Sequence, residues 1–266
     1  MPYAYNLTRE AVHYRHEAFS EGLRAVGFQV SRMPPHGGRP GDLLLLWNRY
    51  GHFHQIATEF ERGGGDVAVA ENGYMGRDKD GHQLFALALR GHNGSGVSPC
   101  GGEERFAGLG IELAPWRKPD PRAKVVVRGQ RGIGSPSMAS PPGWHRTMAS
   151  VLHQRTTRPV QVVEHPGTDA EKNLDHERYL QGAHALVIWS SSVGVKALAL
   201  GVPVFYLAPQ WICGAGAVHG INRLEDPVMD DGLRAFAMRR MAWAQWRVEE
   251  IRSGEAFREL LKCRPA

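Results

Sequence analysis

The sequence predicts an α/β protein with two Rossmann-like lobes that face a cleft. Three observations favour this fold class. Short apolar runs, typical of buried parallel strands, alternate along the chain with stretches of helical periodicity. The segment 115–124 is rich in proline and charge and has little to bury, so it is the predicted linker. Glycine and polar residues follow several predicted strands, at the edge of the sheet where α/β proteins bind ligands.

The first lobe is predicted at 1–118. The run 43–46 is continuously leucine, which is typical of a strand covered on both faces. Residues 71–74, Glu-Asn-Gly-Tyr, are expected to form a loop after the third strand. Helices are predicted at 10–26 and 54–62, each followed by glycine, and strands at 28–30, 42–47, 66–70 and 83–89.

The second lobe is predicted at 119–232, followed by C-terminal helices at 233–266 that pack back on the body. Trp243 and Trp246 are three positions apart and are expected on one side of the last helix, packed against the body. Strands are predicted at 124–128, 159–163, 185–189 and 202–207, and helices at 143–153, 193–200 and through most of 233–261.

Composition places the chain among ordinary globular proteins. Apolar residues make up 42% and charged residues 22%, which excludes a disordered or fibrous protein. The net charge of +5 is a mild basic excess. The 3 cysteines lie far apart and match neither a disulfide framework nor a metal-ligand spacing, which fits a reducing cytoplasm.

Neither a secretory signal nor a membrane span is expected. Residues 1–19 lack the apolar core of a signal peptide. Residues 197–218 have the length and apolar character of a membrane span, but prolines and glycines interrupt them. A helix end, a buried strand and a glycine loop are predicted there instead, and a cytoplasmic location is expected.

Three serines, Ser190, Ser191 and Ser192, lie between a predicted buried strand and the predicted helix that contains Gly194. Hydroxyls and unpaired N–H groups at the start of a helix favour an anion, and the helix dipole adds to this. No lysine followed by serine or threonine accompanies the glycines, so a Walker A loop is excluded. The serines therefore predict either a phosphate site or a plain N-cap.

A second polar strand end is Glu164-His165-Pro166-Gly167. The proline holds the preceding histidine in extended geometry. A histidine placed there either donates to a phosphate oxygen or is a structural residue with its hydrogen bonds satisfied. Two polar strand ends that neighbour each other favour the first interpretation.

These motifs resemble the carboxy-terminal, donor-binding half of GT-B glycosyltransferases. The histidine-proline pair at 165–166, the serines at 190–192 and the following Ala-Leu-x-x-Gly-x-Pro-Val run are most similar to the bacterial sialyltransferase and capsule-polysaccharide (Kdo-transferase-like) group. The resemblance implies a compact GT-B fold in which His165 and the serines hold the phosphate of an activated sugar. It also implies that Glu71, in Glu71-Asn72-Gly73, deprotonates the acceptor hydroxyl.

Two positions depart from this family pattern. Asn72 stands where the group has a second acidic residue. Lys196 stands where many GT-B enzymes have a ribose-binding glutamate, which leaves the nucleotide open. Before the resemblance is considered, Glu71 beside Asn-Gly is equally well explained as a turn carboxylate.

Sugar transfer requires a carboxylate that takes the acceptor proton and positive or N–H groups that stabilise the departing phosphate. Glu71 and His165 are the predicted catalytic residues. The predicted acceptor-binding residues are Asn72, Tyr74, His92 and Asn93, the last two from a glycine loop. The predicted donor-binding residues are Arg131, Gly132, His165, Pro166, Ser190, Ser191, Ser192 and Gly194.

No metal ion and no cofactor are expected, and the nucleotide sugar is the co-substrate. Asp78-Lys79-Asp80-Gly81 imitates the D-x-D metal motif of other glycosyltransferases. Such a sequence between short strands is more typical of an exposed turn.

The sequence thus predicts an inverting glycosyltransferase that uses a nucleotide-activated sugar. The first-half segments ENGYMG and FALALRGHNGSG also resemble uncharacterised glycosyltransferase-like proteins of bacteriophages. Together with the basic charge, this resemblance favours 5-hydroxymethylpyrimidine in phage DNA as the acceptor. A capsule or lipid-linked glycan is the alternative acceptor, and a non-catalytic nucleotide- or DNA-binding module is the alternative class. The sugar and the oligomeric state stay open.

Overall fold

The computed structural model describes residues 1–118, 120–165, 167 and 176–264. Its contacts divide the chain into two compact units. Unit 1 comprises Met1–Gly110, Gly134–Pro136 and Arg239–Ala266, and unit 2 comprises Ile111–Ile133 and Ser137–Met238. The sequence places the division at residue 118, whereas the contacts place it at Gly110 and again inside helix α8 (Asp231–Trp243).

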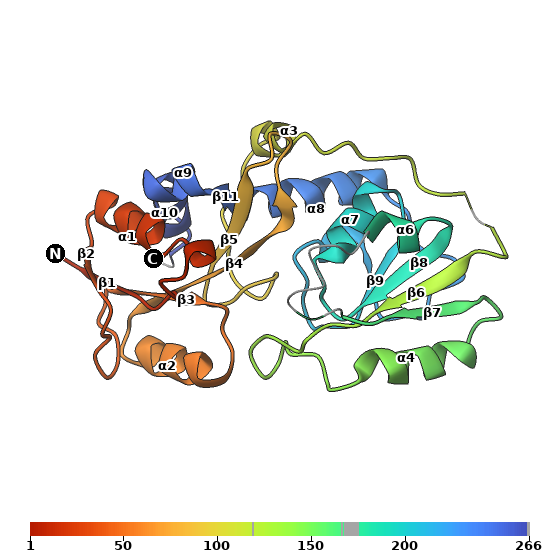
Figure 1. The fold of residues 1–266 in the computed structure, drawn as a ribbon, viewed down its shortest axis with the longest axis horizontal. Coiled ribbons are helices and arrows are strands. Elements are labelled where there is room, and N and C mark those ends of the chain that lie inside the picture. Colours follow the sequence, from red (N-terminus) through yellow and green to blue (C-terminus); the bar gives the residue numbers. More distant parts are fainter. Residues whose placement is uncertain (119, 166, 168–175, 265–266) are drawn as a thin grey trace. The chain divides into compact units, whose positions relative to one another are not determined.

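Unit 1 contains a 6-stranded sheet with the strand order β11-β5-β4-β3-β1-β2 (Figure 1). Strands β1 to β4 are parallel to one another, whereas β5 pairs antiparallel with β4 and β11 pairs antiparallel with β5. The strands are β1 (Tyr3–Asn6), β2 (Gln29–Ser31), β3 (Leu43–Trp47), β4 (Asp66–Arg77), β5 (Gln83–Leu89) and β11 (Gln245–Arg247). The helices are η1 (Val12–Tyr14), α1 (His16–Ala25), α2 (Gly51–Arg62), α3 (Glu104–Leu109), α9 (Val248–Arg252) and α10 (Glu255–Leu261).

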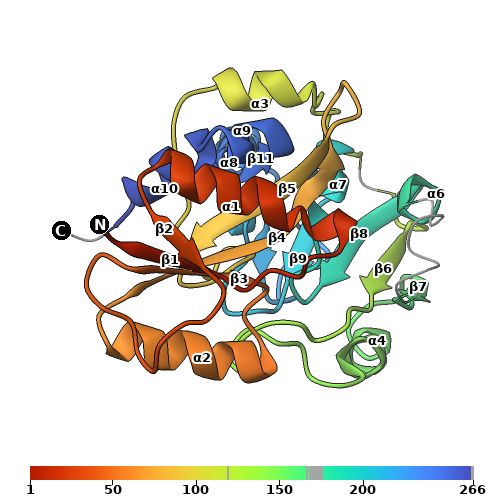
Figure 2. The same ribbon diagram turned by 60° about the vertical axis from the view of Figure 1, so that its left-hand side comes forward.

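Helices cover both faces of this sheet (Figure 2). On one face, α1 and α10 bury Phe19 and Phe257 against the strands. On the other face, α2 buries Phe60 against Leu44 and Leu46. Alternate residues of β3 therefore enter two separate cores, which explains why its sequence is apolar at every position.

Two expectations for unit 1 are wrong. Residues 71–74 do not form a loop, because β4 continues through them as a hairpin with β5, with Glu71 opposite Ala86. The segment around Trp246 is not helical, because Gln245–Arg247 form β11 on the edge of β5 and bury Trp246 completely. In both places hydrogen bonding to β5 overrides the local sequence pattern. For 71–74 the pairing strand follows directly in the hairpin, and for 245–247 it lies far away in the sequence.

Unit 2 contains a 5-stranded sheet with the order β10-β9-β8-β6-β7, in which every pairing is parallel. Helix α4 lies on one face, and α6 and α7 lie on the other (Figure 1). The strands are β6 (Lys124–Arg128), β7 (Val160–Val163), β8 (Ala183–Ile188), β9 (Val204–Tyr206) and β10 (Val218–His219). The helices are α4 (Trp144–His153), α6 (His176–Leu180), α7 (Val193–Ala199) and η3 (Gly214–Gly216), and α8 begins in this unit.

The strands and helices predicted between residues 124 and 207 are confirmed, with ends shifted by a residue or two. The apolar stretch 197–218 contains the end of α7, then β9, η3 and the start of β10, as its prolines and glycines predict. Among the helices of the described residues, none is both long enough and apolar enough to cross a membrane.

Helices α1 and α9 pack so closely at Gly22 that a larger residue is not expected to fit there. A Cβ atom at Gly22 would lie 1.9 Å from the carbonyl oxygen of Ile251, so Gly22→Ala is expected to destabilise the protein by about 1–3 kcal/mol through overpacking. Gly108 in α3 is the matched control, because nothing lies within 4 Å of its Cβ position.

Urea unfolding of both variants checks this. Gly108→Ala should be neutral or stabilising by up to about 1 kcal/mol, since alanine is the better helix former. Equal stabilities for the two variants would contradict the packing of α1 on α9.

Candidate functional site

The strand order of unit 2 places a topological switch point between β6 and β8. The chain passes from β6 to β7 on one side and then to β8 on the other side of β6. Open parallel sheets bind ligands outside the carboxyl ends of the strands at such a point. The residues that follow β6, β7 and β8 are therefore the candidate ligand-binding residues of unit 2.

Gln130 joins the ends of β6 and β8 across this switch point. Its Oε1 accepts a hydrogen bond from the Ser190 N–H at 2.9 Å, and its Nε2 donates to the Ser190 Oγ at 3.2 Å. Ser190 is buried. The structure thus puts the predicted donor residue Ser190 at the switch point and adds Gln130, which sequence reasoning missed.

The other two serines differ in exposure and bonding. Ser192 is exposed and is the N-cap residue of α7, but its side chain makes no capping hydrogen bond. The Oγ of Ser191 accepts from the Val193 N–H at 3.4 Å. A capping role alone therefore explains Ser192 poorly.

Gly194 has a packing reason of its own. A Cβ atom there would lie 2.6 Å from the ring of Trp211 and 2.7 Å from Ile188. The small residue allows α7 to lie close to β8 and to the loop that carries Trp211.

His165 follows β7 and is partly buried. Its Nδ1 accepts a hydrogen bond from the Gly167 N–H at 3.1 Å. In the neutral tautomer that accepts at Nδ1, the proton is on Nε2, which is then a donor. This arrangement suits donation to an oxyanion. Pro166, the other residue of the motif, lies outside the described residues.

Glu164, next to His165, is held by two side chains from α4. The Nε2 of His145 lies 2.6 Å from Glu164 Oε2, and the Nη2 of Arg146 lies 2.9 Å from Oε1. The hydrogen bond from Arg146, followed by the charge of His145, holds the pKa of Glu164 below its ordinary value. Gly129 packs closely against the main chain at His165, since a Cβ atom at Gly129 would lie 3.2 Å from the His165 main-chain nitrogen.

Arg131 and Gly132 lie in the loop after β6. The Arg131 side chain is exposed. Gly132 has a φ of 68°, and its Cβ position is 3.0 Å from the Ser140 carbonyl oxygen, so the glycine is required by the turn.

In unit 1, Glu71 is oriented by two donors on one oxygen. Its Oε1 accepts from the Tyr74 hydroxyl at 2.8 Å and from the Asn93 N–H at 2.9 Å. The same N–H lies 3.2 Å from the Tyr74 hydroxyl oxygen, which closes a triangle. Among the described residues nothing donates to Oε2, so this oxygen is available to take a proton.

The structure brings two of the four predicted acceptor residues onto Glu71. Tyr74 and Asn93 contact Glu71 directly, and His92 precedes Asn93 and is buried. The Nδ1 of His92 is buried without a hydrogen-bond partner among the described residues. Asn72 is exposed and, as the next residue of the strand, points to the opposite face from Glu71.

A polar network at the end of β1 escaped sequence reasoning. The strand order of unit 1 reverses between β1 and β3, which makes this the switch point of that sheet. Asn6 donates to Ser20 Oγ at 2.9 Å and accepts from Thr8 Oγ1 at 2.7 Å, and His16 Nδ1 lies 3.0 Å from Thr8 Oγ1. The sequence signal is the polar Asn6 that ends the strand, with Thr8 two residues later.

Asp78, Asp80 and His82 bring their potential ligand atoms within 4.8 Å of one another. They form the turn between β4 and β5, as predicted, although the Asp78 side chain is fully buried. Burial alone raises the pKa of Asp78, but the His82 N–H and the charge of Arg247 hold it below its ordinary value. Arg247 Nε lies 2.5 Å from the carboxylate, so the arginine already neutralises it.

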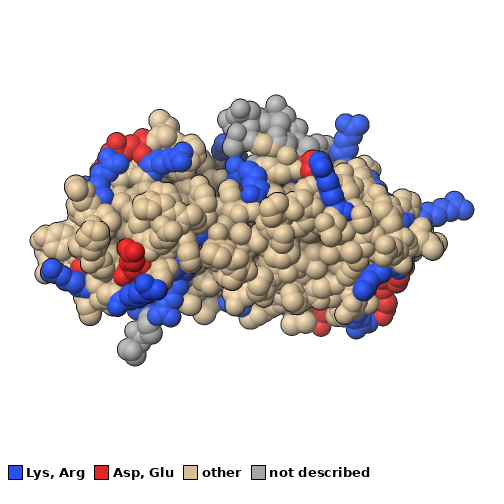
Figure 3. All heavy atoms as spheres, turned by 90° about the horizontal axis from the view of Figure 1, so that it is seen from below, with Lys and Arg blue, Asp and Glu red and all other residues tan. Residues whose placement is uncertain are grey.

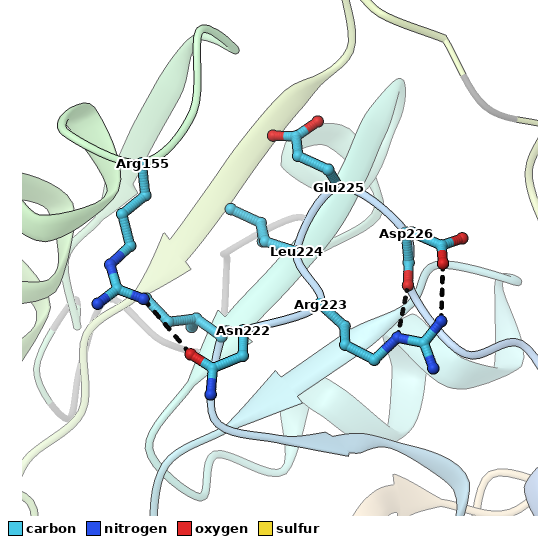
Figure 4. Close-up of a pocket in the computed structure, with 7 residues that line it drawn as sticks. Arg155, Asn222, Arg223, Leu224, Glu225 and Asp226 are labelled. Atoms are coloured by element: carbon cyan, nitrogen blue, oxygen red, sulfur yellow. Dashed lines mark hydrogen bonds and ion pairs between the residues drawn. The ribbon is translucent and has the colours of Figure 1, made fainter.

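Two hollows in the described part of unit 2 lie away from these strand ends. One of about 550 Å³ is lined by Arg155 and residues 221–226, where Arg155 contacts Asn222 and Arg223 pairs with Asp226 (Figure 4). Another of about 230 Å³ borders Ala183 and Pro203, at the amino ends of β8 and β9. Neither contains a predicted donor residue.

The sequence matches no protein-family model and no curated protein. The fold is similar to two solved structures of Thermosulfurimonas dismutans KpsC. The first is a beta Kdo 2,4 transferase, with 13% identity, a TM-score of 0.55 and 90% of both chains covered. The second is a beta Kdo 2,7 transferase, with 13% identity, a TM-score of 0.54 and 98% of both chains covered. The chain therefore has a glycosyltransferase-like fold.

The ion pairs of Glu164 predict a pH-dependent stability. Because the folded state lowers the pKa of Glu164, this residue stabilises the protein above the pKa of an unfolded glutamate, about 4.3. The contribution is lost as the pH falls through the lower folded-state pKa. Glu164→Gln should therefore be less stable than wild type at pH 7, and the difference should shrink toward pH 3.

Urea unfolding at both pH values measures this. Glu112→Gln is the control, because Glu112 is exposed and has no ion pair among the described residues. A Glu164→Gln difference that is unchanged in acid would disprove the electrostatic explanation.

Proposed function

We propose that this protein is a glycosyltransferase that moves a sugar from a nucleotide-activated donor to an acceptor hydroxyl, with inversion at the anomeric carbon. The observation that carries the proposal is the geometry of Glu71. Tyr74 and Asn93 fix one carboxylate oxygen, and no described residue donates to the other. The glycosyltransferase-like fold supports the same conclusion.

In the proposed reaction, Glu71 Oε2 accepts the proton of the acceptor hydroxyl. The hydroxyl oxygen forms a bond to the anomeric carbon while the bond from that carbon to the phosphate oxygen breaks. The phosphate leaves with the electron pair, through a state of oxocarbenium character. Attack from the face opposite the phosphate inverts the configuration.

The donor phosphate is proposed to bind at the ends of β7 and β8. His165 supplies an Nε2 donor, and the exposed Ser192 and Arg131 supply a hydroxyl and a positive charge. Such groups stabilise the negative charge that develops on the leaving phosphate. In other transferases a metal ion performs this role.

For the acceptor, a saccharide hydroxyl is the better supported of the two candidates. The fold neighbours are Kdo transferases. The hydroxymethylpyrimidine of DNA requires a surface that holds many phosphates. On the face drawn in Figure 3, lysine and arginine side chains are scattered among uncharged residues and form no continuous stripe.

Glu71→Gln should abolish sugar transfer and preserve the fold. The amide oxygen of glutamine can still accept from Tyr74 and Asn93, but it cannot take a proton. A loss of about 10²–10⁴ in kcat is expected from removal of a general base. Glu59→Gln, at an exposed position of α2, is the matched control. Full activity of Glu71→Gln would refute the assignment of the base.

Donor and acceptor are tested by incubating the full chain with UDP-, CMP- and other nucleotide sugars. Saccharide acceptors form one arm, and plain or hydroxymethylated DNA forms the other. Mass spectrometry should detect a sugar-sized addition on a saccharide. If sugar were added only to hydroxymethylated DNA, the acceptor would be DNA and not a glycan. If a nucleotide bound without any turnover, the protein would instead be a non-catalytic binding module.

A further inference from the structure

Arg128, the last residue of β6, carries a buried positive charge that no carboxylate of the described residues neutralises. The residue is 2% exposed. Its Nη1 donates to the main-chain oxygens of Val163, at 3.2 Å, and of Glu164. Its Nε is buried without a hydrogen-bond partner among the described residues. Because carbonyl oxygens carry no net charge, the described residues leave the charge of the guanidinium uncompensated.

The other buried arginines of the described chain are compensated. Arg49 places Nη1 and Nη2 each 2.7 Å from the carboxylate of Glu61. Arg234 places Nη2 2.7 Å from Asp231. Burial of an unpaired charge is expensive, so a protein that keeps one has a reason to do so.

The carboxylate of Glu164, whose main chain contacts Arg128, pairs with other side chains. Glu164 contributes its main-chain oxygen to Arg128, but its side chain pairs with His145 and Arg146 of α4. That side chain is 52% exposed, whereas Arg128 lies in the interior. Glu164 therefore does not compensate Arg128, and no other described carboxylate forms an ion pair with it.

The unoccupied donors of Arg128 share one edge of the guanidinium. An arginine has five N–H groups in a planar fork. The two on Nη1 are directed at the carbonyls, whereas no described residue accepts from Nη2 or Nε. The Nε–Nη2 edge presents parallel N–H groups, the geometry in which arginine binds two oxygens of a phosphate at once.

We propose that Arg128 is a ligand-binding residue whose Nε–Nη2 edge holds a phosphate group at the switch point of unit 2. Arg128 lies on the strand between the ends of β7 and β8, with His165 following one neighbour and Ser190, bonded to Gln130, following the other. The charge of the phosphate compensates the buried guanidinium. The identification of this phosphate with that of the donor nucleotide rests on the proposed function.

Isothermal calorimetry with the full chain tests the proposal, using inorganic pyrophosphate, UDP and CMP as probes. Arg128→Met, which keeps the side-chain volume but removes the charge, should weaken binding at least about tenfold, the loss expected for a bidentate charge-assisted contact. Arg128→Lys keeps the charge but not the fork and should bind with intermediate affinity. Arg146→Met, on the exposed side of Glu164, is the control and should bind as wild type does.

Three results would overturn the proposal. The probes bind Arg128→Met as tightly as wild type, Arg146→Met loses as much affinity as Arg128→Met, or no probe binds the wild-type protein. If circular dichroism shows that Arg128→Met does not fold, the affinity of Arg128→Lys is used instead. Weaker probe binding than wild type then supports the proposal, and wild-type affinity overturns it. The proposed function fails separately. Arg128-dependent binding without sugar transfer removes the function and leaves the phosphate site. Sugar transfer with an unchanged donor KM in Arg128→Met removes the phosphate site and leaves the function.

Discussion

The polar residues at the end of β6 hold the candidate ligand site of unit 2 together. Arg128 fixes the carbonyls that precede His165, Gly129 leaves room for the His165 backbone, and Gln130 uses both ends of its amide on Ser190. The central strand therefore sets the positions of both neighbouring strand ends. A rigid scaffold of this kind is what a preorganised phosphate site requires.

In unit 1, a hairpin and a loop fix the position of the Glu71 carboxylate. Glu71 is a residue of a strand, and the hairpin of β4 with β5 fixes its backbone. The loop after β5 then returns and places the Asn93 N–H on the carboxylate, with Asn93 itself in the left-handed region at a φ of 51°. Such a conformation is uncommon for a residue other than glycine, and the hydrogen bond to Glu71 compensates part of its strain.

Local patterning predicted most of the fold, because a strand covered on both faces must be apolar throughout. The runs that became β3, β6 and β8 show this directly. The extension of β4 and the existence of β11 were missed for the opposite reason. Gly73 and the polar residues around it are typical of a turn, and Gln245–Arg247 continue a helical stretch. Only the edge of β5, which offers hydrogen bonds to both, makes them strands.

The sequence by itself determined that polar residues follow buried strands, and hence that Glu71, His165 and the serines were candidates. The tertiary structure decided which of these residues meet and what surrounds them. It placed Tyr74 and Asn93 on Glu71, turned Asn72 to the other face and buried Arg128 where no described residue supplies a counter-charge. The physical reason is that strand order and side-chain burial depend on pairings between distant segments, whereas the periodicity of a sequence records only which face of its own element each residue occupies.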